Sequence, residues 1–191
     1  MAAALSLAER GVGRTGNNPS VGCVIVKNDI VIGRGWTQSG GRPHAEAMAL
    51  AQAGAEARGS TVYVTLEPCA HVSQRGPACA QLLMEAAPAR VIVALQDPDA
   101  RTAGEGMATL KASGIEVMAG VMASEARQNL AGFLSRMSRG RPFVTLKIAS
   151  TLDGQIAMAD GSSRWITGEI ARAHSHVERA RSDAILVGAG T

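Results

Sequence analysis

Aromatic residues are scarce in this chain of 191 residues, which has two Phe, one Tyr and two Trp. Proteins that bind single-stranded nucleic acid stack bases on aromatic rings, so few such platforms exist here. Long apolar runs are also missing, and none approaches the roughly 18 residues that a membrane-spanning helix needs. The N-terminal segment lacks the basic start of a secretory signal and soon carries charge at Glu9 and Arg10. We therefore expect a cytoplasmic protein whose partners include neither a membrane nor a nucleic acid.

Cysteines are also few, and their odd number of three argues against a secreted disulfide framework. Cys23 lies inside the apolar run 21–26 and is most simply a buried strand residue. The formal net charge of +3 and the pI near 9.1 suit a small anionic substrate but are too mild to indicate nucleic-acid binding. A hydrophobic content of 46% is ordinary for a globular protein with a real core.

Apolar runs and turn residues predict an alternation of strands and helices along most of the chain. Nearly continuous apolar strands between helices are typical of an α/β protein, in which helices cover both faces of a mostly parallel, buried sheet. The expected strands are 21–26, 30–34, 61–66, 90–95 and 115–118, the first two joined as a hairpin by residues 27–29. The expected helices are 2–10, 44–57, 77–87 with Pro77 as its first residue, 105–112 and 123–138.

The segment Arg139-Gly140-Arg141-Pro142 reads as a domain boundary, which divides the chain into residues 1–139 and 140–191. Beyond it we expect strands at 143–149 and 183–187 and a helix at 169–181. So short a segment is unlikely to complete an α/β core. The second part is therefore expected to be the opening of a domain that is cut short.

Two stretches carry residues suited to a metal site: His44 with Glu46 two residues later, and Cys69 with Cys79. One imidazole and two thiolates fill three corners of a zinc tetrahedron, and the open fourth corner favours catalysis over a structural role. Each stretch follows an expected strand and leads into an expected helix, whose N-terminal partial charge favours thiolate. Glu46 is then the spare carboxylate that moves a proton.

This pattern matches the zinc-deaminase signature, which joins His-x-Glu to Pro-Cys-x-x-Cys, in all but one respect. Nine residues separate Cys69 from Cys79, so the loop must bulge and can offer side chains to a substrate. His71 as a fourth ligand would make an inert cage and leave Glu46 without a role. The pattern also leaves open a nucleoside, free-base or tRNA deaminase, and a non-catalytic, zinc-stabilised binding module.

Several further segments carry recognisable motifs. They are residues 18–22, His44-Ala45-Glu46, 65–71, Asp97-Pro98-Asp99, 145–147, Leu152-Asp153-Gly154, Trp165-Ile166-Thr167 and 187–191. Together they resemble the bifunctional riboflavin-biosynthesis deaminase/reductase family. The resemblance implies a cytidine-deaminase-like three-layer α/β/α sandwich, followed by the truncated start of a dihydrofolate-reductase-like domain. It implies removal of the 2-amino group of 2,5-diamino-6-(ribosylamino)pyrimidin-4-one 5′-phosphate, and NADPH-dependent reduction of the ribosyl chain.

The same resemblance suggests substrate and cofactor contacts. Asn18 would hydrogen-bond the pyrimidine edge or serve as a turn former, and His71 would contact base or phosphate or cap its loop. Arg75, the one cation between the two cysteines, would bind the substrate phosphate or lie solvated. Asp97 and Asp99 would shape a turn above the site or contact the substrate. In the second part, the residues expected to face NADPH are Ala149, Trp165 and Thr191, and those expected to face the reductase substrate are Ser163 and Arg179. The sequence leaves open whether the protein forms a homo-oligomer.

Overall fold

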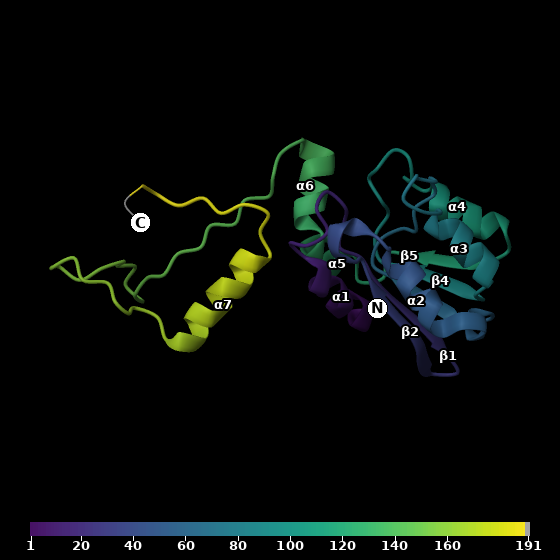
Figure 1. Ribbon diagram of the computed structural model, residues 1–191, viewed down its shortest axis with the longest axis horizontal. Coiled ribbons are helices and arrows are strands. Elements are labelled where there is room, and N and C mark those ends of the chain that lie inside the picture. The colour runs from purple at the N-terminus through teal and green to yellow at the C-terminus, as the bar shows by residue number, and fades with distance from the viewer. Residues whose placement is uncertain (190–191) are drawn as a thin grey trace. The chain divides into compact units, whose positions relative to one another are not determined.

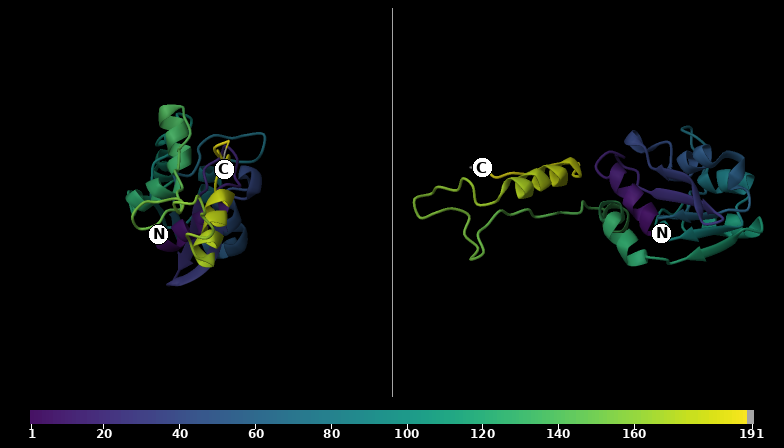
Figure 2. Two further views of the ribbon diagram at one scale, coloured as in Figure 1. Left: turned by 90° about the vertical axis from the view of Figure 1, so that its left-hand side faces the viewer. Right: turned by 90° about the horizontal axis from the view of Figure 1, so that it is seen from below.

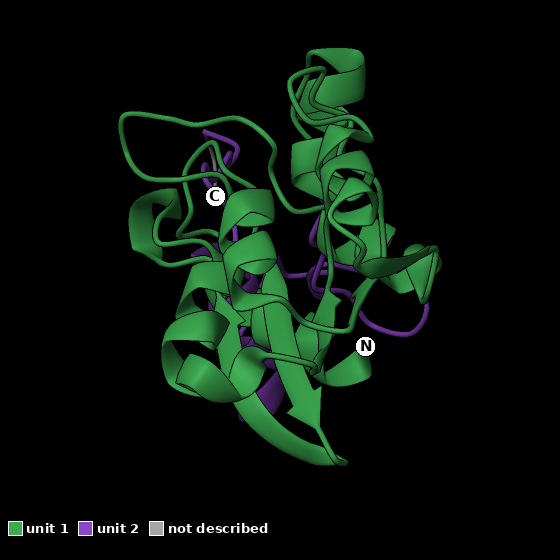
Figure 3. Cartoon of the chain, turned by 90° about the vertical axis from the view of Figure 1, so that its right-hand side faces the viewer, with its two compact units in different colours: residues 1–143 green, residues 144–191 purple. Residues whose placement is uncertain are grey.

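A computed structural model describes residues 1–189 of the chain (Figure 1). Its contacts divide the chain into two units, Met1–Phe143 and Val144–Thr191, which Figure 3 colours separately. The domain ranges 1–139 and 140–191 stay predictions, since a division by contacts does not test whether each part folds alone.

The first unit is built on a five-stranded sheet in the order β2-β1-β3-β4-β5 (Figure 1). Strand β1 runs antiparallel to both of its neighbours, whereas β3, β4 and β5 are parallel to one another. The bounds are β1 Gly22–Lys27, β2 Ile30–Trp36, β3 Thr61–Val64, β4 Arg90–Val93 and β5 Glu116–Ala119.

The prediction of a mostly parallel sheet is confirmed, in the form of a mixed sheet with one reversed strand. Four of the five strands point the same way, but the β1–β2 hairpin places the reversed strand β1 between β2 and β3. The hairpin turns at Asn28 and Asp29, whose φ angles of 50° and 61° are left-handed. Two successive left-handed residues match the twist of a tight hairpin, as the turn residues predict.

Helices cover both faces of the sheet, which confirms the predicted three layers (Figure 1 and Figure 2). Alternate residues of β1 point to opposite faces of the sheet. On one face Gly22 lies against the backbone of the first helix, and on the other face Cys23 and Ile25 belong to the main hydrophobic core beneath the second helix. Ile25 and Leu83 are fully buried in that core. The bounds are α1 Ala2–Ala8, α2 Ala45–Ala53, α3 Cys79–Ala86, α4 Glu105–Ala112, α5 Ala123–Asn129 and α6 Ala131–Arg139.

Four predicted helices differ from the observed ones. The α-helical parts of 2–10 and 44–57 end at Ala8 and Ala53, where the 3-10 turns Glu9–Gly11 and Gly54–Ala57 follow. The run 123–138 is broken at Leu130, which separates α5 from α6. Helix α3 begins at Cys79 rather than at Pro77, because Ala78 is extended (φ −68°, ψ 139°) and acts as the N-cap. This later start lets the Cys79 N–H point at the Sγ of Cys69, 3.2 Å away. The start of the helix is therefore fixed by a residue ten positions upstream.

The second unit contains one helix, α7 (Glu169–Ala180), close to the predicted range 169–181. The strands predicted at 143–149 and 183–187 do not form among the described residues. These segments are unpaired, and Val144 and Leu186 are 81% and 98% exposed. A strand requires hydrogen-bonded neighbours, which these segments lack in the described part of the chain. Between residues 1 and 189, no helix has both the length and the apolar character needed to cross a membrane.

Candidate metal centre

Three predicted ligands converge where two helices begin. His44 is the N-cap of α2, and Cys79 is the first residue of α3. Cys69 follows β3 through a short buried segment. The Nδ1 atom of His44 lies 3.2 Å from the Sγ of Cys79 and 3.6 Å from the Sγ of Cys69. All three ligand atoms lie within 4.8 Å of one another.

This spacing fits one tetrahedral zinc ion. Zn–S bonds of about 2.3 Å and Zn–N bonds of about 2.0–2.1 Å place nitrogen and sulfur about 3.6 Å apart around a tetrahedral centre. The two observed nitrogen–sulfur distances lie near that value. Nitrogen and sulfur donors of this kind suit zinc better than magnesium or calcium.

His71 does not belong to this group of ligand atoms, as far as the described residues extend. Its Nδ1 instead lies 3.4 Å from the hydroxyl oxygen of buried Thr102. A four-ligand cage that includes His71 is therefore not formed. Three protein ligands leave a position that water or a substrate can take.

The two thiols share their protons unequally. The Cys79 side chain donates a hydrogen bond to Cys69 and holds the pKa of that thiol well below its usual range, assisted by His44 and by the Cys79 N–H. The same hydrogen bond and burial raise the pKa of Cys79. One thiolate is thus formed in advance at Cys69, and a divalent ion would displace the proton that Cys79 keeps.

Glu46 lies in the first turn of α2, two residues after His44, and is only 3% exposed. Burial raises the pKa of this carboxyl to about 6, while the nearby His44 opposes the shift. Its side chain also interacts with that of Cys79, so it lies against the ligand group. A carboxyl with a pKa near neutrality can both accept and return a proton.

The loops that carry the ligands are joined by two arginines. Arg75 donates from Nη2 to the carbonyl oxygen of Gly40 (2.7 Å), and Arg42 donates from Nη1 to that of Pro77 (3.4 Å). Asn18 lies against the same loop, since a Cβ on Gly41 would overlap its amide. The structure thus brings Asn18 and Arg75 to the loop that leads to His44. Arg42 was missed by the sequence analysis, although its place directly before Pro43-His44 was a signal.

A second residue missed by the sequence analysis is Glu67, which is 2% exposed at the end of the β3 segment. Its carboxylate accepts hydrogen bonds from the N–H groups of Asp97, Gly104 and Met107. An acidic residue beside buried apolar positions was the available signal. Asp97 itself accepts a hydrogen bond from the Asp99 N–H (2.9 Å), as expected of a turn, and burial raises its pKa to about 6.

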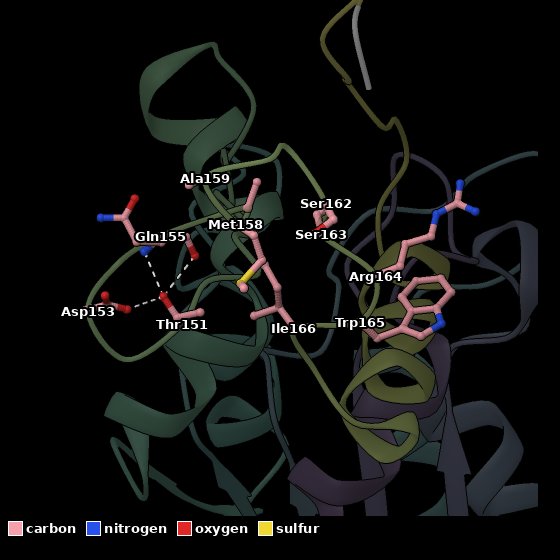
Figure 4. Close-up of a pocket in the computed structure, with 11 residues that line it drawn as sticks. Thr151, Asp153, Gln155, Met158, Ala159, Ser162, Ser163, Arg164, Trp165 and Ile166 are labelled. Carbon is pink, nitrogen blue, oxygen red and sulfur yellow. Dashed lines mark hydrogen bonds between the residues drawn. The ribbon is translucent and has the colours of Figure 1, made fainter.

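The residues predicted for the reductase are only partly brought together. Ser163 and Trp165 line a pocket of about 510 Å³ in the second unit (Figure 4). The guanidinium carbon of Arg172 lies 4.5 Å from the centre of the Trp165 ring. Ala149 and Arg179 do not line this pocket. Thr191 lies outside the described residues.

Comparison with known proteins gives two family matches. Residues 1–95 match the cytidine and deoxycytidylate deaminase zinc-binding region, and residues 142–191 match the RibD C-terminal domain. The riboflavin biosynthesis protein RibD of Escherichia coli (strain K12) is 49% identical over 191 residues, which are 100% of this chain and 52% of that protein. The chain therefore spans about half the length of the curated relatives it matches.

Two solved structures share the fold over most of the chain. One is RibD of Acinetobacter baumannii (form 1), with a TM-score of 0.83 and 51% identity over 95% of this chain and 51% of that one. The other is a diaminohydroxyphosphoribosylaminopyrimidine deaminase/5-amino-6-(5-phosphoribosylamino)uracil reductase of Thermotoga maritima, with a TM-score of 0.83 and 39% identity over 92% of this chain and 51% of that one. The first unit thus has a cytidine-deaminase-like α/β fold. With both family matches in sequence order and these relatives aligned across nearly its whole length, the chain belongs to the RibD family of riboflavin biosynthesis proteins.

Proposed function

We propose that the first unit is a zinc-dependent aminohydrolase of riboflavin biosynthesis. Its reaction converts 2,5-diamino-6-(ribosylamino)pyrimidin-4-one 5′-phosphate and water to 5-amino-6-(ribosylamino)uracil 5′-phosphate and ammonia. The observation that carries the proposal is the three-ligand group of His44, Cys69 and Cys79 with the buried carboxyl of Glu46 against it. The family of the chain supports the choice of substrate.

In this reaction His44, Cys69 and Cys79 hold the metal, and Glu46 moves protons. When bound, zinc lowers the pKa of a water ligand towards neutrality and so supplies a nucleophile. Glu46 takes one proton from the attacking water as the oxygen adds to the ring carbon that bears the 2-amino group, and passes it to the ring nitrogen. It then takes the remaining proton from the added oxygen and gives it to the departing amine, so that the C–N bond breaks, the C=O bond forms and ammonia leaves. Its raised pKa suits both transfers.

Three side chains around the ligand group would contact the substrate. The amide of Asn18 would pair with the pyrimidine edge, because an amide can both donate and accept. Exposed Arg75 would bind the 5′-phosphate, since a guanidinium forms paired hydrogen bonds with phosphate oxygens. His71, half-buried beside Thr102, would contact the base or the phosphate from the Cys69–Cys79 loop.

For the full-length protein we propose a second activity, the NADPH-dependent reduction of the ribosyl chain of the deaminated product. The match of residues 142–191 to the RibD C-terminal domain supports it. The described residues do not form a cofactor site by themselves, because Ala149 and Arg179 lie outside the pocket lined by Ser163 and Trp165. We therefore expect no NADPH oxidation by this chain on its own.

A substrate panel tests the proposed deaminase directly. We expect zinc-loaded protein to release ammonia from the diaminopyrimidine phosphate, and far less from cytidine or guanine. Preferential turnover of cytidine or guanine would favour a nucleoside or free-base deaminase instead. Zinc-dependent melting without ammonia release from any of the three would indicate a non-catalytic binding module.

The phosphate contact has its own test. Arg75→Ala should raise KM for the phosphorylated pyrimidine by about tenfold or more, as expected for the loss of a hydrogen bond to a charged group. It should raise KM for the dephosphorylated pyrimidine much less, because there only the contact of Arg75 with the Gly40 carbonyl is lost. Arg58→Ala is the matched control, because Arg58 is also exposed but lies at the end of the turn after α2. An equal effect of Arg75→Ala on both pyrimidines would contradict the phosphate role.

A further inference from the structure

Glu67 is a buried carboxylate whose described hydrogen-bond partners are all main-chain N–H groups. Its Oε2 accepts from Asp97 (3.2 Å) and Gly104 (3.0 Å), and its Oε1 accepts from Met107 (3.1 Å). Gly104 is the N-cap of α4, and Met107 lies in the first turn of that helix. Both carboxylate oxygens are therefore used to hold residues 97–107 against the segment that delivers Cys69. The negative charge at the start of α4 also suits the helix dipole.

The contact beside Glu67 is too close for any side chain. Gly106 is buried in the first turn of α4, and a Cβ built on it would overlap the carbonyl oxygen of Pro68. The same Cβ would lie 3.3 Å from the Oε1 of Glu67. Helix α4 therefore approaches the backbone directly before Cys69 as closely as glycine allows.

Residues 97–107 also contact the chain on both sides of Cys69. The buried Asp97 donates its N–H to Glu67, two residues before Cys69. Thr102 is fully buried, and its hydroxyl contacts the ring of His71, two residues after Cys69. Residues 97–107 thus form a wall along the segment that carries Cys69.

We propose that Glu67 is a positioning residue for the deaminase reaction. It fixes residues 97–107 so that Asp97 and the Thr102–His71 contact keep their places along the segment that carries Cys69. Glu67 does not touch the reacting atoms; it acts through the wall that it holds. This inference rests on the proposed deaminase function.

Glu67→Gln is the most direct test, because glutamine keeps the size of the side chain. Its single amide oxygen can accept from one side only, and its NH2 group then faces N–H donors on the other. Glu105→Gln is the matched control, since Glu105 is also in the first turn of α4 but is exposed. The measurements are zinc content, hydrogen exchange of residues 97–107, and kcat and KM for the diaminopyrimidine phosphate below the melting temperature.

We expect Glu67→Gln to keep one zinc per chain and to speed hydrogen exchange in residues 97–107 by at least about tenfold. Its kcat/KM should fall about 10–100-fold, mainly through KM, as is usual when a group that supports a metal site is lost. Glu105→Gln should match the unsubstituted chain in all three measurements. Unchanged exchange in Glu67→Gln, or faster exchange with unchanged kinetics, would overturn the proposal.

Gly106→Ala perturbs the contact between α4 and the segment before Cys69 from the α4 side. It tests the proposal if Glu67→Gln does not fold. Alanine is the better helix former, so a loose contact would make this variant more stable and equally active. We expect instead faster exchange in residues 97–107 and a raised KM. Wild-type stability and kinetics in Gly106→Ala would overturn the proposal. Failure of the unsubstituted chain to release ammonia would contradict the proposed function itself, and the exchange data would still decide whether Glu67 holds the segment.

Discussion

Replacing Gly35 with alanine should damage the metal centre although Gly35 is not one of its ligands. Gly35 lies in β2 beneath α2, the helix that begins after His44 and carries Glu46. A Cβ there would lie 2.7 Å from the backbone nitrogen of Ala49 and closer still to the carbonyl oxygen of Ala45. Since ordinary contact begins at about 3.4 Å, α2 must move by at least about 0.7 Å. Zinc–ligand distances tolerate only about 0.2 Å.

The expected cost follows from this overlap. Forcing one extra carbon into a packed contact destabilises by about 1–3 kcal/mol. At about 2–4 °C per kcal/mol, the melting temperature should fall by about 2–12 °C. Zinc affinity, measured by competition with a chelator, should fall at least about tenfold, because His44 moves with the helix.

Gly132→Ala is the matched control for this prediction. Gly132 is an exposed glycine of α6 with nothing within 4 Å of a built Cβ, so its replacement should leave zinc affinity unchanged and stabilise slightly. If Gly35→Ala binds zinc and melts like the unsubstituted chain, then the close packing of α2 on β2 does not determine the position of His44. The reasoning would then be refuted.

Three further results are expected. Glu46→Gln should retain zinc and lose about 10²–10⁴-fold in kcat, because the amide cannot carry the proton; turnover near the wild-type level would rule out this role. Cys69→Ala should lose stoichiometric zinc, whereas Cys23→Ala should keep it, since Cys23 is buried in the core outside the ligand group; equal zinc loss in both variants would contradict the ligand assignment. Bound zinc at a free concentration 1,000 times Kd stabilises the folded state by about 4 kcal/mol, so removing it with a chelator should lower the melting temperature. A melting temperature that the chelator does not change would show that the folded protein holds no zinc.

The sequence was sufficient to predict which donor side chains meet, because each of them belongs to a short local pattern. His44 and Glu46 share one helix start, and Cys69 follows a strand directly. Zinc chemistry then requires the three donors to meet, which the observed distances confirm. Most strands and helices of the first unit were predictable for the same reason, since apolar periodicity is local.

What the sequence did not reveal depends on distant partners. The antiparallel pairing of β1 with β3 joins segments about 40 positions apart, and no local pattern encodes it. The role of Glu67 depends on main-chain groups 30 to 40 positions downstream, which have no signature of their own. The later start of α3 depends on the Sγ of Cys69. In the second unit, the apolar segments read as strands but have no neighbouring strand among the described residues.

X-ray absorption at the zinc edge tests the three-ligand centre most directly. With one zinc per chain, the spectrum should show two sulfurs at about 2.3 Å and two lighter atoms at about 2.0–2.1 Å, of which only one belongs to an imidazole. The second lighter atom would be the oxygen of a solvent ligand in the open position. A spectrum with two imidazoles, or with any number of sulfurs other than two, would contradict the account.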